Sequence, residues 1–264
     1  MPQGELNGWS YAYTDEGSGP PIVLLHGLEM DRSLFDHQVE TLRDDYRVVT
    51  IDAPGHGESA PVELGIDFWQ YADMVAGVAD QLGIGEAVWG SQSMGGFTIL
   101  RLALTHPERV KGLILSDTAA HAEDPDKLAQ YEAFLKVSLE EGVSEDLVNI
   151  LMLVFFSQTF AAKPEADVWR KKLAAIDVRG AHAMIRAVFD RDDIQDRVGE
   201  IRCPAVVIHG EEDVAIDPEQ GEELARDLPD ATFVAVKDAG HAAVYESPDV
   251  VTTAIKDFLK RINY

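Results

Sequence analysis

Short apolar segments typical of β-strands alternate along this chain with longer segments of helical periodicity. The strand-like segments lie at residues 9–14, 21–25, 46–51, 86–89, 110–115, 205–208 and 232–236. The helix-like segments between and after them lie at residues 31–43, 68–82, 94–105, 218–228 and 248–262. Because helices separate the strands, we expect an α/β fold with a mostly parallel, doubly wound sheet and right-handed crossovers.

The alternation stops between residues 120 and 198, where no convincing strand occurs. The helix-like segments of this stretch lie at residues 124–141, 144–156, 164–176 and 181–189. After it the strand and helix alternation resumes. We therefore expect an α/β core made of residues 1–119 and 199–264, interrupted by a helical insertion at 120–198.

The charge balance excludes several classes of partner. The 264 residues include 47 acidic and 22 basic side chains, which give a formal net charge of −25. Nucleic acids and anionic membranes repel such a chain. No apolar run reaches the roughly 20 residues that cross a bilayer, and the first residues do not resemble a signal peptide, so we expect a cytoplasmic protein. The acidic excess fits either an adaptation to high salt or an ordinary acidic protein.

The segment VWGSQSMGG at residues 88–96 lies between a strand-like and a helix-like segment and contains two serines. A nucleophile elbow turns sharply, so the residues two before and two after its nucleophile must be small. Ser93 has Ser91 and Gly95 at these positions, whereas Ser91 has the bulky Trp89 two residues before it. We therefore predict that Ser93 is the nucleophile and Ser91 a spacer. Taken alone, a serine at the start of a helix is more commonly a cap of that helix, here the segment at 94–105.

A nucleophilic serine needs a base to accept its proton and an acid to orient that base. His241 follows the last predicted strand, and Asp213 follows the strand before it. The carboxyl ends of strands in an open α/β sheet face the ligand crevice, so we predict His241 as the base and Asp213 as the acid. Glu212, Asp217 and Asp117 compete with Asp213, although Asp217 precedes a proline and fits better as a helix cap.

Acyl transfer also needs hydrogen-bond donors for the oxyanion that forms during the reaction. We expect the backbone N–H of Met94, directly after Ser93, to supply one donor. The backbone N–H of Leu28, in the loop after the second strand-like segment, is expected to supply the other. His26 and His56 are interpreted as structural residues. The eight histidines lack metal-ligand spacing, so we predict no metal site.

Five motifs follow one another along the chain: HGLEM at 26–30, DAPGHGES at 52–59, SQSMGG at 91–96, HGEEDVAIDP at 209–218 and DAGHAAVYESP at 238–248. In this order they resemble the signature blocks of the α/β-hydrolase superfamily, and they span nearly the whole chain outside the insertion. The resemblance implies an α/β-hydrolase fold with a mostly parallel eight-stranded sheet flanked by helices and a helical cap inserted after the sixth strand. The order of serine, acid and histidine is also that of the superfamily.

The segments SDTAA at 116–120 and 191–218 show a weaker similarity to 3-oxoadipate enol-lactonases and small carboxylesterases.

The elbow has Ser91 where many relatives have glycine and Gln92 where many have histidine, and Glu29 lies close to the expected oxyanion loop. Gln92 and Glu29 are therefore expected to shape the substrate side of the site. Candidates for an apolar lining from the insertion are Phe155, Phe156, Trp169, Met184 and Phe189. Candidates for gripping a substrate carboxylate, or for solvated helix faces, are Arg170, Arg179 and Arg186.

These features predict a serine hydrolase that cleaves a small carboxylic ester or lactone through an acyl-enzyme on Ser93. The predicted reaction uses no cofactor, its partner is a small-molecule substrate, and we expect the protein to act as a monomer or homodimer. A nucleophilic serine argues against the haloalkane dehalogenases and epoxide hydrolases of the superfamily, which attack with a carboxylate. The same machinery leaves open an enol-lactonase, a C–C bond hydrolase, a perhydrolase or a ligand receptor with little turnover.

Overall fold

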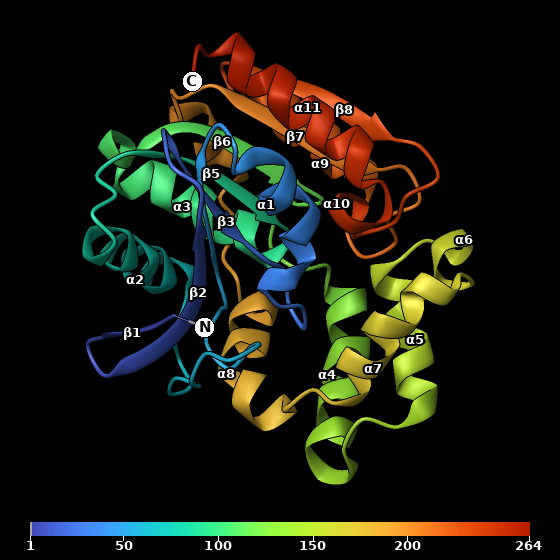
Figure 1. Ribbon diagram of the computed structural model, residues 1–264. Helices are drawn as coiled ribbons and strands as arrows, with labels where there is room; N and C mark the ends of the chain where they lie inside the picture. Colours follow the sequence, from blue (N-terminus) through green and yellow to red (C-terminus); the bar gives the residue numbers. More distant parts are fainter. Residues whose placement is uncertain (1) are drawn as a thin grey trace.

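An eight-stranded sheet forms the centre of the computed structural model, which describes residues 2–264 (Figure 1). The strands are β1 (Gln3–Leu6), β2 (Trp9–Glu16), β3 (Pro21–Leu25), β4 (Arg47–Ile51), β5 (Ala87–Gln92), β6 (Val110–Ser116), β7 (Ala205–Gly210) and β8 (Ala231–Val236). Their order across the sheet is β1-β2-β4-β3-β5-β6-β7-β8. β2 pairs antiparallel with β1 and with β4, and the other neighbouring strands are parallel. The expected mostly parallel, eight-stranded sheet is confirmed.

Helices surround this sheet in the part of the chain that the structure describes. The α-helices are α1 (Asp36–Leu42), α2 (Phe68–Gln81), α3 (Met94–Thr105), α4 (Pro125–Glu141), α5 (Glu145–Phe155), α6 (Gln158–Ala161), α7 (Asp167–Ala174), α8 (Val178–Phe189), α9 (Pro218–Asp227), α10 (Ala243–Glu246) and α11 (Pro248–Arg261). Short 3₁₀ turns occur at Arg32–Phe35, Pro107–Arg109, Pro164–Ala166 and Gln195–Glu200. Within residues 2–264, no helix combines the length and the apolar character needed to cross a membrane.

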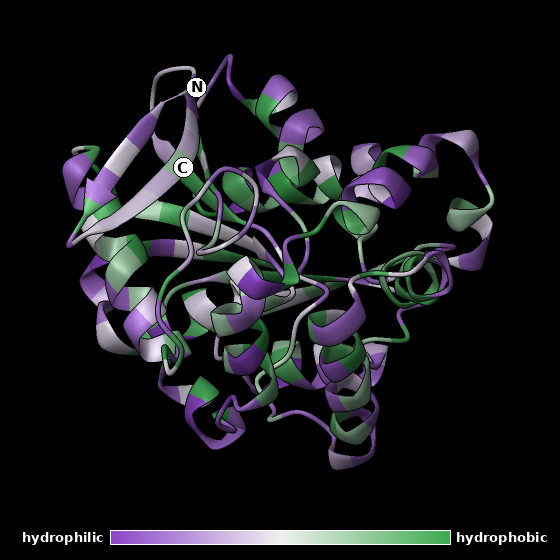
Figure 2. Ribbon diagram, turned by 90° about the horizontal axis from the view of Figure 1, so that it is seen from below, coloured by the Kyte–Doolittle hydropathy of each residue, from purple (hydrophilic) through white to green (hydrophobic). Residues whose placement is uncertain are grey.

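Side chains of the central strands alternate between the two faces of the sheet, and different helices cover each face. Ile22 and Leu24 of β3 join the core that contains α1 and α11. Val23 and Leu25 join the core that contains α2 and α3. Figure 2 shows hydrophobic residues gathered in the interior and hydrophilic residues on the outward turns of the helices. The continuous apolar runs therefore supply both cores, as expected for buried central strands.

The helices α4 to α8 form the insertion between β6 and β7. Figure 1 shows them gathered on one side of the sheet, below it in that view. α8 places Val178, Ile185 and Phe189 in the core that contains α2 and α3. α5 places Met152 and Phe155 in the core on the other face. Apolar contacts therefore attach the insertion to both layers of the α/β core.

Several elements differ from their expected bounds. The sequence pattern misses β1, because its residues are only partly buried and contain no apolar run. The helix expected at 31–43 begins as a 3₁₀ turn, because the Asp31 carboxylate accepts a hydrogen bond from the Ser33 N–H and caps that turn before α1. The helix expected at 164–176 likewise divides into a 3₁₀ turn and α7. α6 and α10 have four residues each and are too short to show periodicity.

Candidate active site

Ser93 lies at a sharp turn between β5 and α3. Its backbone has φ 48° and ψ −114°, a conformation that strains a residue with a side chain. Glycines leave room for this turn. A Cβ on Gly95 would lie 2.1 Å from the Leu25 carbonyl oxygen, and a Cβ on Gly96 would lie 2.3 Å from Thr118 Oγ1. The segment therefore has the geometry of a nucleophile elbow centred on Ser93.

Ser91, the other serine of the segment, is buried inside the sheet and is 1% exposed. Its Oγ donates a hydrogen bond of 3.1 Å to the Ile114 carbonyl oxygen. Trp89 is equally buried, and its indole N–H donates to the Arg109 carbonyl oxygen at 3.0 Å. Ser91 is therefore held in the sheet by its own hydrogen bond, and only Ser93 of the two serines lies at the turn.

Three side chains from separate loops form a hydrogen-bonded chain. His241 follows β8, and its Nε2 lies 2.8 Å from Ser93 Oγ. Asp213 follows β7, and its Oδ2 lies 2.7 Å from His241 Nδ1. All three side chains are buried. In this geometry a neutral His241 donates its Nδ1–H to Asp213, which leaves Nε2 to accept a hydrogen bond from the serine hydroxyl.

The carboxyl group of Asp213 is held in its ionised form. Burial acts to raise its pKa, but the charge of His241 and the hydrogen bonds from His209 and His241 outweigh burial and lower the pKa to about 2. The second carboxylate oxygen, Oδ1, accepts hydrogen bonds from the Ala215 N–H at 2.8 Å and the Ile216 N–H at 3.0 Å. These contacts fix the carboxylate in the orientation that faces His241.

Two of the competing acids lie away from the histidine. Glu212 is exposed. Asp217 caps α9, because its carboxylate accepts a hydrogen bond of 3.0 Å from the Glu219 N–H. Asp213 is therefore the carboxylate that lies against His241.

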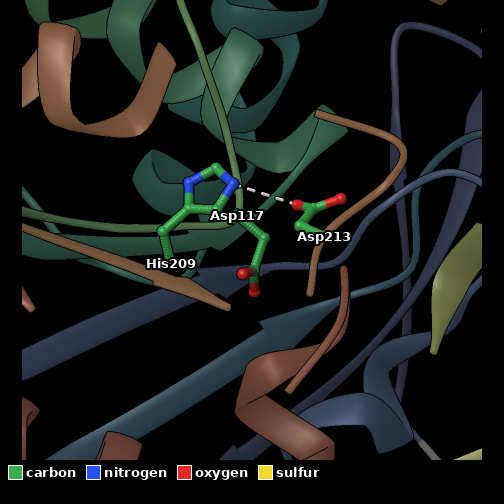
Figure 3. A group of neighbouring side chains, drawn as sticks. All are labelled: Asp117, His209 and Asp213. Atoms are coloured by element: carbon green, nitrogen blue, oxygen red, sulfur yellow. Dashed lines mark ion pairs between the residues drawn. The ribbon is translucent and has the colours of Figure 1, made fainter. Parts of the chain in front are cut away.

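Asp117, the remaining competitor, lies next to Asp213 and His209, as Figure 3 shows. His209 Nε2 lies 3.0 Å from Asp213 Oδ2, a contact that the sequence analysis missed. The two oxygens of Asp117 accept hydrogen bonds from the Gly210 N–H at 2.9 Å and the Ala243 N–H at 3.2 Å. Burial raises the pKa of Asp117 to about 7. Because protein donors already occupy these carboxylate oxygens, we interpret the cluster as support for Asp213 and not as a metal centre.

The two backbone N–H groups expected to bind an oxyanion are free. Neither the Leu28 N–H nor the Met94 N–H has a hydrogen-bond acceptor within residues 2–264. His26 braces the loop that carries Leu28. Its Nδ1–H donates to the Gly27 carbonyl oxygen at 2.7 Å, and its Nε2 accepts from the Ala53 N–H at 2.9 Å. Burial lowers the pKa of His26, so the ring stays neutral and keeps both contacts.

Gln92 does not line the cavity beside Ser93, which corrects the expectation that it shapes the substrate side. The residue is 1% exposed, and its side-chain N–H donates a hydrogen bond of 2.5 Å to the His241 carbonyl oxygen. The amide occupies space that Gly27 leaves free, since a Cβ there would lie 1.9 Å from Gln92 Oε1. Gln92 therefore links the elbow to the loop that carries His241.

Replacing Gln92 by methionine is expected to lower kcat about tenfold with little change in KM, because the His241 loop loses its link to the elbow. Steady-state kinetics on p-nitrophenyl butyrate measure both constants. Gln38 offers a matched control, since its side-chain N–H donates to the Val244 carbonyl oxygen at 3.1 Å in a buried site. Gln38→Met is expected to lower the Tm similarly without the loss in kcat. An unchanged kcat in Gln92→Met contradicts the positioning role.

A cavity that is partly open to solvent lies between the α/β core and the insertion. Ser93 and His241 line it together with Leu28 and Glu29. Phe155 of α5 also lines the cavity, and its ring stacks on the His241 ring with centroids 6.2 Å apart. The rest of the lining is mostly apolar and comes largely from α4, α5 and α8. Apolar cavities with a few polar groups at one end are typical binding sites for small organic ligands.

Three residues expected in this lining, Phe156, Trp169 and Met184, do not contact the cavity. Phe156 and Trp169 instead pack against Tyr245, with ring centroids 6.4 and 5.5 Å from it. Met184 is fully buried in the core beneath α8. Helical periodicity identifies apolar faces but does not tell which face meets the cavity. Phe189 does line the cavity, as expected, and lining residues that the sequence analysis did not single out include Tyr131, Phe134, Leu135, Ile185 and Val188.

The arginines considered from the sequence do not reach the cavity. Arg170 and Arg179 donate hydrogen bonds to backbone carbonyl oxygens, and Arg186 pairs with carboxylates on the surface. Arg191 does line the cavity, but its Nη1 lies 2.9 Å from a carboxylate oxygen of Glu123. The arginines therefore already have partners within the protein.

Known proteins similar to this chain share its fold. A model of the alpha/beta hydrolase fold family matches residues 20–248. Among solved structures, a thermophilic esterase from Thermogutta terrifontis with malate bound is 30% identical, with 99% of this chain and 97% of that one covered and a TM-score of 0.91. The enol-lactonase from Burkholderia xenovorans is 29% identical, with 98% and 100% covered and a TM-score of 0.91. The pimeloyl-[acyl-carrier protein] methyl ester esterase of Nitrosomonas europaea is 28% identical over 239 residues, which are 88% of this chain and 93% of that protein.

Proposed function

The chain belongs to the alpha/beta hydrolase fold family, and from this premise we propose that it is a serine hydrolase that cleaves small carboxylic esters or lactones. The observation that carries the proposal is the hydrogen-bonded chain from Ser93 Oγ through His241 to Asp213, with distances of 2.8 and 2.7 Å. A serine connected in this way loses its proton to histidine as it attacks a carbonyl carbon. The similarity to esterases and an enol-lactonase supports the same class of reaction.

In the first half of the proposed reaction, Ser93 Oγ attacks the substrate carbonyl carbon while its proton passes to His241 Nε2. The carbonyl oxygen becomes an oxyanion, which accepts hydrogen bonds from the free N–H groups of Leu28 and Met94. The bond to the leaving oxygen then breaks, and His241 gives its proton to that oxygen. The acyl group stays on Ser93, and in a lactone the leaving oxygen stays tethered to it.

In the second half, His241 Nε2 removes a proton from water as the water oxygen attacks the acyl carbon. The same N–H groups stabilise the second oxyanion. Its collapse breaks the bond to Ser93 Oγ, which takes the proton back from His241, and the carboxylic acid is released. Asp213 stays ionised throughout, because its pKa lies at about 2, and it stabilises the imidazolium. All proton transfers use groups of this chain and water.

The apolar lining predicts a dependence on acyl chain length. We expect kcat/KM to rise about tenfold from p-nitrophenyl acetate to p-nitrophenyl butyrate, because each buried methylene contributes about 0.8 kcal/mol. Palmitate is expected to gain little beyond butyrate, because the cavity is partly open and leaves the distal part of so long a chain in contact with water. Steady-state release of p-nitrophenol measures these values. Equal kcat/KM for acetate, butyrate and palmitate would show that the cavity does not hold the acyl chain.

A fluorophosphonate probe tests the proposed function directly. The probe is expected to inactivate the protein and to add its mass to the peptide that contains Ser93. Ser91→Ala serves as the control and is expected to react as the wild type does, because Ser91 bonds to the sheet and not to His241. Sustained turnover of esters supports the enzyme. A single turnover that leaves a lasting acyl group favours the ligand receptor instead.

A further inference from the structure

One carboxyl group at the cavity lacks a partner. Glu29 follows Leu28 in the oxyanion loop and lines the cavity with Ser93 and His241. Its Oε2 is buried and has no hydrogen-bond partner within residues 2–264. Burial raises the pKa of Glu29 to about 7. The reaction steps described above make no use of this group.

The guanidinium, imidazole and other carboxylate side chains that line the cavity do have partners. Arg191 Nη1 lies 2.9 Å from Glu123 Oε2, and His241 Nδ1 lies 2.7 Å from Asp213 Oδ2. A carboxyl group in apolar surroundings costs free energy unless a hydrogen-bonding group satisfies it. A substrate bound in the cavity is in a position to supply that group to Glu29.

The loop holds Glu29 in one conformation. Its φ of 59° is in the left-handed region that favours glycine, and its N–H donates to His56 Nε2 at 3.1 Å. The other ring nitrogen of His56 donates to the Pro54 carbonyl oxygen at 2.9 Å. Burial lowers the pKa of His56 to about 3, so the neutral ring accepts from Glu29 across the neutral pH range. The backbone of Glu29 is therefore fixed at the cavity that Ser93 also lines.

We propose that Glu29 determines substrate specificity by pairing with a hydroxyl or ammonium group that the substrate carries close to its scissile carbonyl. This inference rests on the proposed function, because the substrate in question is the ester that Ser93 attacks. An ionised carboxylate has only acceptor atoms, so its partner must be a hydrogen-bond donor. Hydroxy-substituted or amino-substituted esters and lactones are therefore favoured. Substrates with a carboxylate at that place are disfavoured.

The other charges of the protein also disfavour substrates that carry a carboxylate. The formal net charge of −25 repels anionic substrates as they approach. Inside the cavity, the guanidinium of Arg191 is paired with Glu123, so its positive charge is already balanced. A substrate carboxylate would therefore meet the charge of Glu29 without a compensating cation.

Isosteric methyl esters test the inference with the wild-type protein. Methyl 3-hydroxybutyrate and methyl 3-aminobutyrate each carry a donor where methyl 3-methylbutyrate carries a methyl group, and monomethyl succinate carries an anion. We assay above the Glu29 pKa of about 7, where the carboxyl is mostly ionised. We expect kcat/KM for the two donor-bearing esters to exceed that of the methyl isostere by about tenfold or more. Monomethyl succinate is expected to be the poorest substrate.

Two variants distinguish a substrate hydroxyl from a substrate ammonium group as the partner of Glu29. Glu29→Gln keeps an acceptor oxygen without the charge, so it is expected to retain the preference for the hydroxy ester and lose that for the amino ester. Glu29→Met removes the acceptor and is expected to lose both preferences. Ratios of kcat/KM between substrates within one variant are insensitive to a general loss of activity. Labelling of Ser93 by the fluorophosphonate shows that the variant site is intact.

The outcomes distinguish this inference from the proposed function. Equal kcat/KM for the isosteres in the wild type, a preference for monomethyl succinate, or unchanged ratios in Glu29→Met would overturn the inference and leave the serine mechanism standing. Failure to hydrolyse any ester, with no labelling of Ser93, would overturn the proposed function itself. If the Glu29 variants do not fold, the wild-type ratios alone decide between the two results.

Discussion

Replacing Ser93 by alanine is expected to lower kcat for p-nitrophenyl butyrate by a factor on the order of a million. Without Oγ no acyl-enzyme forms, and only the oxyanion N–H groups and the apolar cavity remain to promote attack by water. Within residues 2–264 the hydroxyl makes a single hydrogen bond, to His241 at 2.8 Å, so its removal leaves the packing of the elbow intact. Steady-state release of p-nitrophenol measures kcat, and thermal unfolding verifies that the variant is folded.

Ser91→Ala is the matched control for this loss. It removes a hydroxyl from the same segment, and the lost hydrogen bond to the Ile114 carbonyl oxygen lies within the sheet. We expect its kcat to stay close to that of the wild type, with a modest decrease in Tm. If Ser93→Ala retained wild-type turnover, or if Ser91→Ala were the inactive variant, the assignment of the nucleophile would be wrong.

Replacing Asp213 by asparagine is expected to lower kcat by about four orders of magnitude. The amide of asparagine has the shape of the carboxylate, but it cannot stabilise an imidazolium and it favours the wrong tautomer of His241. The ring then presents Nε2–H to Ser93 Oγ and cannot accept the serine proton. Steady-state kinetics give the loss in kcat, and the rate of fluorophosphonate labelling at Ser93 gives the loss in nucleophile activation.

Asp117→Asn is the control for the acid. Asp117 is buried beside Asp213, but its oxygens accept hydrogen bonds from the Gly210 and Ala243 N–H groups and not from His241. Its pKa of about 7 means that part of the population is already neutral near pH 7, which the amide mimics. We expect a loss in kcat of less than about tenfold. A greater loss in Asp117→Asn than in Asp213→Asn would identify Asp117 as the acid that orients the base.

Much of the fold and the candidate triad could be predicted because the signals are local. The apolar run at 21–25 is long enough for a buried strand and too short for a helix, and the structure has β3 there. Ser93 could be chosen over Ser91 because the size of Trp89 two residues earlier excludes a tight turn on Ser91. The carboxyl ends of β7 and β8 then bring Asp213 and His241 to the same edge of the sheet.

Other parts of the site depend on contacts between distant segments. The contact between His209 and Asp213 had a possible signal in the sequence, since the histidine lies near the end of β7 and four residues before the acid. That spacing does not say which way the imidazole ring points. Trp169 and Met184 lie on α7 and α8, and Phe156 is the residue that ends α5. Their rotation against the core, and not their periodicity, decides which residues meet the cavity.

The sequence by itself determined the order of strands and helices and the choice of Ser93 as the candidate nucleophile, because residue size and apolar spacing act over a few neighbouring residues. Only the tertiary structure decided what Gln92 and Glu29 do. Gln92 turns inward to the His241 carbonyl, 149 residues away along the chain. Glu29 stays at the cavity without a partner for its Oε2 among the described residues. Both outcomes depend on which distant groups the folded backbone brings within hydrogen-bond distance. The spacing of residues along the sequence does not predict such contacts.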